Sequence, residues 1–240
     1  MLPIKIDTRE FELLYYNIMA DYTVPLCLAI SSVKEASGNS CLSYALARRM
    51  AASDHKVLLI DLNIEKPDLS ELLAAKQTEW SPENFDSNAF VERLGDTGLS
   101  IMAAPLQSAE LWSFREKKIL SEMISQLKKE YDVIIIDIPH LLSEQNTQAL
   151  IASEIICAVC DTTILNLLSG KVSENDIVNC THLLKKSGAR LHGFVMNDQF
   201  HPSLKDEICR ELDRIKFLLP RFVEKMKAKV RANIFLSQEI

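Results

Sequence analysis

The sequence lacks three features that would place it in a class at once. Its 27 basic residues are outnumbered by 33 acidic ones, for a net charge of −6, so no strong basic field favours nucleic acid. The opening residues, MLPIKIDTREF, contain no apolar core of a signal peptide. The longest apolar runs, such as VIII at 133–136, are too short to span a bilayer. We therefore expect a cytoplasmic protein that does not bind nucleic acid.

The 240 residues do contain enough apolar sequence for a core: 48% are hydrophobic, which fits one α/β domain. Short apolar runs without alternation are separated by segments of helical periodicity, a pattern typical of a doubly wound, mostly parallel sheet with helices on both faces. The expected strands are 26–31, 55–61, 99–104, 131–139, 155–160 and 191–197. The expected helices are 8–22, 40–52, 68–74, 108–130, 144–152, 172–187 and 203–216, with a polar surface insertion at 75–98.

Six cysteines are present, and Cys157 and Cys160 form a CxxC pair. On the strand expected at 155–160, residues three apart point to opposite faces, so the two thiols could not bind one metal ion. We interpret the cysteines as reduced, structural thiols.

The segment ISSVKEASGNSC, at 30–41, follows a predicted strand and precedes a predicted helix, which is the layout of a phosphate-binding loop. Such a loop needs glycines to close round the phosphates, a lysine to neutralise them and a hydroxyl to hold Mg²⁺. Gly38 and Ser40 fit these roles. Asn39 stands at the lysine position, and Ala36 stands where a further glycine would help. Taken alone, the segment fits a plain strand-to-helix turn equally well.

Two aspartates, Asp61 and Asp137, each end a predicted strand. In an open parallel sheet, ligands bind beyond the carboxyl ends of the strands. We therefore expect both carboxylates and the Gly38 loop to share one crevice.

Several segments resemble, in order, the bacterial tyrosine kinases of the capsule and exopolysaccharide (CpsD/CapB) type, a family within the MinD/ParA-like P-loop ATPases. KVLLIDLNIEKPDLSELL is similar to the family motif VLLID-A-D-x-R-x-P, and YDVIIIDIPHLL is similar to YDxVIIDTPPVL. GLSIMAAPLQSAELW, GARLHGFVMN and REFELLYYNI resemble further family segments. The resemblance implies a P-loop NTPase fold that binds ATP or ADP with Mg²⁺.

Departures from the family pattern fall at its functional positions. Asn39 replaces the loop lysine and Asn63 replaces the second aspartate of the family motif. Asn197 matches an asparagine that contacts adenine in related ATPases, although asparagine is also common at strand ends. The tyrosine-rich tail of the kinases has no counterpart after Tyr131. The implied, vestigial nucleotide site is Ala36, Gly38, Asn39, Ser40, Cys41, Asn63 and Asn197, and the implied, weakened Mg²⁺ site is Ser40, Asp61 and Asp137.

The missing lysine charge would cost about 2.7–4 kcal/mol in a phosphoryl-transfer transition state, or about a thousandfold in rate. We therefore expect a non-catalytic regulatory or scaffolding protein of polysaccharide synthesis or export, with weak nucleotide binding at most. Lys34 offers an alternative, because it matches the lysine that crosses the ParA/MinD dimer interface to the partner's nucleotide. The chain would then be an active ATPase or tyrosine autokinase. Lys34 also fits an ordinary exposed loop lysine, and a MinD/ParA-like positioning protein is a third hypothesis.

The expected organisation has three parts: an N-terminal helix for oligomerisation or docking at 1–24, the P-loop NTPase-like domain at 25–220, and a basic amphipathic helix at 221–240. The last segment fits either a helix packed on the domain or one that lies on the inner face of a membrane. The resemblance implies two partners: a second copy of the chain, in a dimer or ring, and a membrane-embedded polysaccharide chain-length or export protein.

Overall fold

The computed structural model describes residues 9–35, 37–95, 97–106, 111–142, 151–198 and 226. The chain divides into two compact units, Met1–Asn197 and Asp198–Ile240, and the fold is that of the first. The helix expected at 203–216 and the basic segment at 221–240 lie outside the described residues, apart from the helical Met226. Within the described residues, no helix is both long and apolar enough to cross a membrane.

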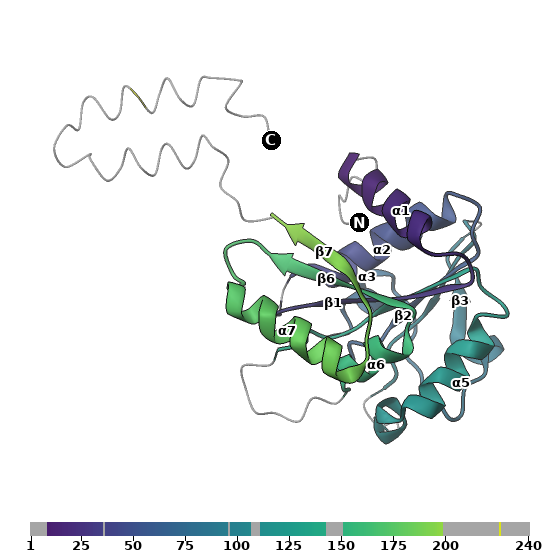
Figure 1. The fold of residues 1–240 in the computed structure, drawn as a ribbon. Coiled ribbons are helices and arrows are strands. Elements are labelled where there is room, and N and C mark those ends of the chain that lie inside the picture. The colour runs from purple at the N-terminus through teal and green to yellow at the C-terminus, as the bar shows by residue number, and fades with distance from the viewer. Residues whose placement is uncertain are drawn as a thin grey trace. The chain divides into compact units, whose positions relative to one another are not determined.

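Within the described residues, seven strands form one sheet in the order β3-β4-β2-β5-β1-β6-β7 (Figure 1). Neighbouring strands are parallel except for β3 and β4. The strands are β1 (Leu26–Ser32), β2 (Val57–Asp61), β3 (Val91–Arg93), β4 (Leu99–Met102), β5 (Val133–Asp137), β6 (Thr162–Leu168) and β7 (Leu191–Asn197). The predicted fold class, a doubly wound and mostly parallel sheet, is confirmed.

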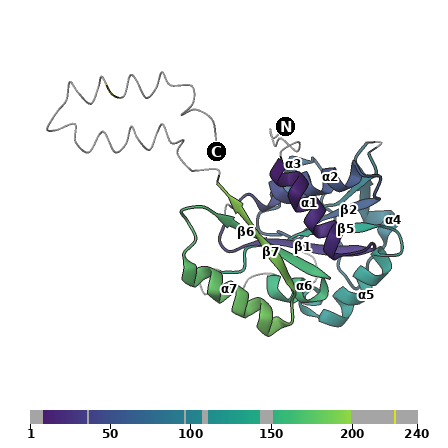
Figure 2. The same cartoon turned by 45° about the horizontal axis from the view of Figure 1, so that its top comes forward.

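Strand β1 shows why the sheet needs a cover on both faces. Successive side chains of a strand point to opposite sides. Cys27 and Ala29 lie in one core, whereas Leu26, Leu28 and Ile30 lie in the other. The first core is covered by η1 (Leu111–Arg115), α5 (Lys117–Leu127), α6 (Ser153–Val159) and α7 (Glu174–Ser187). The second is covered by α1 (Arg9–Asp21), α2 (Asn39–Ala51) and α3 (Asp68–Leu72) (Figure 2). Helix α4 (Ser87–Phe90) leads directly into β3.

Helix α1, predicted at 8–22, lies against α2 through Arg49. The Arg49 guanidinium donates to both carboxylate oxygens of Glu12, at 2.6 and 2.8 Å, and lies 4.0 Å from the ring centroid of Tyr15. The bidentate ion pair and the cation–π contact orient α1 on α2 in addition to its apolar packing. Leu13 and Tyr16 stay exposed, at 51% and 61%.

The strand expected at 155–160 is wrong, because Ser153–Val159 form helix α6, and strand β6 was not expected. A short apolar run does not distinguish a buried strand from a buried helix. The argument that Cys157 and Cys160 point to opposite faces therefore fails. Both thiols are nevertheless buried, and Cys160 Sγ lies 3.5 Å from Cys27 Sγ.

Other boundaries shift for local reasons. The helix expected at 108–130 is interrupted at Glu116, between the 3₁₀ turn η1 and α5, and residues 107–110 lie outside the described chain. The polar segment at 75–98 contains α4 and β3, which pairs antiparallel with β4 at the edge of the sheet. Most of the helix expected at 144–152 lies outside the described residues.

Candidate functional site

Three neighbouring strands, β2, β5 and β1, end at one edge of the sheet. Asp61 at the end of β2 is in register with Asp137 at the end of β5, which is also in register with Ile30 of β1. The loop after β1 runs into α2, whose first residue is Asn39. The structure therefore brings the loop and both aspartates together at the carboxyl edge.

The loop after β1 is held by two asparagine side chains from β6 and β7. Gly38 has φ +80°, a left-handed conformation that favours glycine, and a Cβ there would lie 2.9 Å from Asn197 Nδ2. The carbonyl of Ser37 accepts hydrogen bonds from Asn166 Nδ2 at 2.6 Å and from Asn197 Nδ2 at 2.9 Å. Asn197, which was interpreted either as an adenine contact or as an ordinary strand-end asparagine, contacts the loop in this structure. Ala36 lies outside the described residues.

Asn39 cannot reproduce a lysine. Its Nδ2 donates to the carbonyl of Ile138, just beyond β5, at 3.4 Å. Its Oδ1 is buried and has no hydrogen-bond partner among the described residues. An amide of this kind brings no positive charge to the loop.

Both carboxylate oxygens of Asp61 accept hydrogen bonds from the protein. Oδ1 accepts from the backbone N–H of Asn63 at 2.9 Å, and Oδ2 accepts from the N–H and hydroxyl of Ser70 at 2.8 and 2.7 Å. Burial raises the pKa of Asp61 to about 6, although these hydrogen bonds oppose the shift. The carboxyl therefore holds the turn after β2 and the start of α3.

Asp137 is bonded more sparsely, although it is only 1% exposed. Oδ1 accepts from the Ser43 hydroxyl at 3.3 Å, and Oδ2 has no hydrogen-bond partner among the described residues. Burial and the nearby Asp61 raise the pKa of Asp137 well above its usual value, against the opposing effect of the Ser40 and Ser43 hydroxyls. Its surroundings therefore favour the protonated form of this carboxyl more than water does.

The predicted Mg²⁺ ligands lie together at this edge but are not equally available to a metal. Mg²⁺ takes oxygen ligands in near-octahedral geometry and keeps several waters. Both oxygens of Asp61 already accept protein hydrogen bonds, whereas Asp137 Oδ2 is buried without a partner among the described residues. Within the described residues, no group of three or more His, Cys, Asp or Glu side chains is placed to hold a metal. Ser40 and Asp137 are therefore better suited than Asp61 to hold the ion, and the site stays a prediction.

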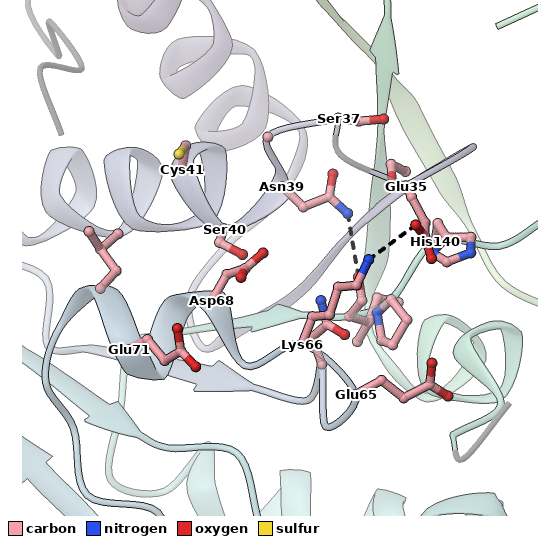
Figure 3. Close-up of a pocket in the computed structure, with 16 residues that line it drawn as sticks. Glu35, Ser37, Asn39, Ser40, Cys41, Glu65, Lys66, Asp68, Glu71 and His140 are labelled. Atoms are coloured by element: carbon pink, nitrogen blue, oxygen red, sulfur yellow. Dashed lines mark hydrogen bonds and ion pairs between the residues drawn. The ribbon is translucent and has the colours of Figure 1, made fainter. Parts of the chain in front are cut away.

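A crevice of about 480 Å³ opens beside the loop (Figure 3). Its walls are residues 38–41, the turn after β2 with the start of α3, and residues 138–140. Burial, followed by the charges of Asp137 and Asp68, raises the pKa of the Cys41 thiol in this wall, so the thiol stays protonated. The charged side chains that line the crevice are Glu35, Glu65, Lys66, Asp68 and Glu71.

Lys34 does not line this crevice. Its Nζ lies 3.0 Å from Oδ2 of Asp176, in the first turn of α7. Hydrogen bonds from Ser173, followed by the one from Lys34, lower the pKa of Asp176 to about 2. Lys34, for which a role across a dimer was the alternative interpretation, therefore pairs with a carboxylate of its own chain.

Comparisons with known proteins show what the whole chain resembles. No model of a known protein family matches the chain. The tyrosine-protein kinase CpsD of Streptococcus agalactiae is 25% identical over 175 residues, covering 71% of this chain and 74% of that protein. CpsD of Streptococcus pneumoniae is 24% identical over 199 residues, covering 81% and 85%. The chain is a homologue of the bacterial CpsD tyrosine kinases.

Solved structures agree on the fold of this CpsD homologue. The kinase domain of the Escherichia coli tyrosine kinase ETK superimposes with a TM-score of 0.66 at 18% identity, over 79% of this chain and 73% of that one. The septum site-determining protein MinD of Pyrococcus horikoshii, complexed with Mg-ADP, gives a TM-score of 0.60 at 20% identity, over 74% and 72%. The fold is thus that of the tyrosine kinase domains and the MinD/ParA P-loop ATPases.

Sequence reasoning missed several residues that shape the site of this CpsD homologue. Asn166 lies in the unexpected strand β6 and donates to the loop carbonyl of Ser37. Ser70 connects Asp61 to the N–H of Ala104, beyond β4, at 2.9 Å. An asparagine inside an apolar run, such as the one in TTILNLL, was the only sequence signal for the first, and the second had none.

Proposed function

We propose that this CpsD homologue is a non-catalytic regulatory or scaffolding protein of capsule or exopolysaccharide synthesis or export. The observation that carries the proposal is Asn39. It occupies the position of the loop lysine, and its side-chain amide donates a hydrogen bond to the carbonyl of Ile138. Loss of one preorganised donor costs a transition state about 2.7–4 kcal/mol, and the loss of a full charge at a phosphate costs no less. Phosphoryl transfer would slow by about a thousandfold.

The acids at the strand ends support the same interpretation. Catalysis by P-loop enzymes uses ionised carboxylates to hold Mg²⁺ and orient water. Asp61 is committed to Ser70 and Asn63, and Asp137 is buried with a raised pKa. On this proposal the crevice binds ATP or ADP weakly and does not turn it over.

An active enzyme that uses Lys34 in trans has less support. Its ammonium lies 3.0 Å from Asp176, which Ser173 holds in place by a capping box at the start of α7. A neighbour's nucleotide would have to displace this carboxylate before Lys34 could reach it. We keep Lys34→Ala as the variant that tests this route.

Helix α1 is the proposed docking element. Its anchor to α2 uses Glu12 and Tyr15, which leaves Leu13 and Tyr16 exposed. Exposed apolar and aromatic side chains on one helix suit a protein partner. The proposed partners are a second copy of the chain, in a dimer or ring, and a membrane-embedded chain-length or export protein, which would place the chain at the inner face of the membrane.

The deciding experiment incubates the full chain with radiolabelled ATP and Mg²⁺, beside an active CpsD kinase as the positive control. We expect neither phosphotyrosine nor released phosphate above a protein-free blank, because the loop lacks its lysine and Asp61 is committed to protein hydrogen bonds. Turnover that disappears in Lys34→Ala would establish the route in trans. Turnover that survives this substitution would equally contradict the non-catalytic proposal.

A further inference from the structure

Lys66 is a cation that lines the crevice, at the position before the proline that the family motif VLLID-A-D-x-R-x-P leaves unspecified. It follows β2 in the turn before α3, and its side chain rises from the opposite wall toward Asn39 and Glu35 (Figure 3). Among the described residues that line the crevice, it is the one side chain with a permanent positive charge. The crevice therefore contains a positive charge that position 39 lacks, and this charge belongs to Lys66 in the turn between β2 and α3.

The partner of Lys66 is part of the phosphate loop. Its Nζ lies 3.1 Å from Oε2 of Glu35, and the two side chains are 63% and 59% exposed. An ion pair this exposed contributes little to stability, so a competing anion can replace the carboxylate. Glu35 thus occupies on this ammonium the position that a phosphate oxygen would take.

The ammonium of Lys66 keeps donors that a ligand could use. An ammonium has three N–H donors, of which Glu35 uses one. Asn39 does not compete for this ammonium, because its Nδ2 donates to the carbonyl of Ile138. Figure 3 shows Lys66 and Glu35 joined across the crevice below the loop.

The other charged side chains of the crevice are acidic, so binding of an anion there would depend on Lys66. Glu65, Asp68 and Glu71 also line the crevice, so its lining is net negative even with the lysine present. A polyphosphate approaching such a surface is repelled unless one cation lies directly at its binding point. Without Lys66, only the loop backbone and the N-terminus of α2 would attract it.

We propose that Lys66 supplies from the turn before α3 the positive charge that the phosphate loop lacks at Asn39, and that Glu35 holds this ammonium until the phosphates of a nucleoside triphosphate displace it. This inference rests on the proposed function, in which the crevice binds a nucleotide without turning it over. It names Lys66 as the binding residue and Glu35 as its competitor.

The test is an equilibrium titration of the full chain with a fluorescent ATP analogue, with and without Mg²⁺. We expect Lys66→Ala to weaken binding by about tenfold or more and Lys66→Arg to retain it, because a charge-assisted contact to phosphate is lost in the first and kept in the second. Glu35→Gln should tighten binding by about two- to fivefold, since it removes an exposed competitor. Lys118→Ala, at an 87% exposed lysine on α5, is the matched control and should leave binding unchanged.

A rescue experiment separates a lost charge from a damaged fold. Combining Lys66→Ala with Asn39→Lys returns the charge to the loop and should restore most of the binding. Equal affinities of parent and Lys66→Ala would overturn the inference. A parent that does not bind millimolar ATP would also overturn it while leaving the non-catalytic proposal intact, whereas hydrolysis of bound ATP would contradict that proposal alone.

Discussion

Asp61 and Asp137 end neighbouring parallel strands in the same register, yet their surroundings differ. Asp61 accepts three hydrogen bonds, from Asn63 and from both donors of Ser70. Asp137 accepts one long hydrogen bond from Ser43, and its Oδ2 has no partner among the described residues. The difference teaches that equivalent positions in a motif do not imply equivalent roles, because Asp61 organises a turn and Asp137 does not.

The largest expected difference between the two aspartates is in the free energy of unfolding of their alanine variants. Asp61→Ala leaves the donors of Ser70 and Asn63 buried and unsatisfied, so the free energy of unfolding should fall by about 3–4 kcal/mol. Asp137→Ala removes one long hydrogen bond and should cost about 1 kcal/mol. Urea unfolding followed by circular dichroism measures both values at one pH. Equal losses would show that the two acids share one structural role.

The pH dependence of stability should sharpen the same contrast. Between pH 4 and 6 the unfolded chain has Asp61 ionised, with its usual pKa of 3.8, whereas the folded chain keeps the proton up to about 6. The folded state therefore binds more protons in this window, and its stability falls as the pH rises, by about 3 kcal/mol in all. Asp176, whose pKa is lowered to about 2, acts below this window and in the opposite direction.

Unfolding free energies at half-unit steps from pH 4 to 8 check this expectation. Asp61→Asn should flatten the curve between pH 4 and 6, because the titrating group is gone. Asp137→Asn should also flatten the curve from about pH 4 upward, because burial, followed by the charge of Asp61, raises the pKa of Asp137 well above its usual value. A parent whose stability rises steadily through pH 4–6 would contradict the raised pKa of Asp61.

Local signals were enough to predict the edge of the sheet where the crevice opens. An apolar run followed by an aspartate marks the end of a buried strand, and Asp61 and Asp137 both follow this rule. Gly38, just before α2, likewise predicted a turn, and its φ is the left-handed value that the turn requires. The failure at β6 has a local cause too: the apolar run in α6 took the place of the next strand in the predicted order.

Contacts between distant segments could not be predicted from local patterns. Asn166 meets the carbonyl of Ser37 across 129 positions, and Lys66 meets Glu35 across 31. Each pair depends on the register of the sheet, which a single sequence leaves open. Motif comparison showed which charge position 39 lacks, whereas only the folded chain showed where another charge lies.

The smallest expected difference in unfolding free energy is between variants of Ser70 and Ser43, the serines whose hydroxyls donate to Asp61 and Asp137. Ser70 donates to Asp61 and accepts from the N–H of Ala104, so Ser70→Ala leaves one buried donor unsatisfied and should cost about 2 kcal/mol. Ser43→Ala removes only the 3.3 Å bond to Asp137 and should cost about 0.5 kcal/mol. Ser70→Ala should also shift the stability loss between pH 4 and 6 to higher pH, because its hydroxyl lowers the pKa of Asp61. Denaturant melts of both variants over that range measure the difference, and an unshifted curve for Ser70→Ala would show that burial alone sets the titration of Asp61.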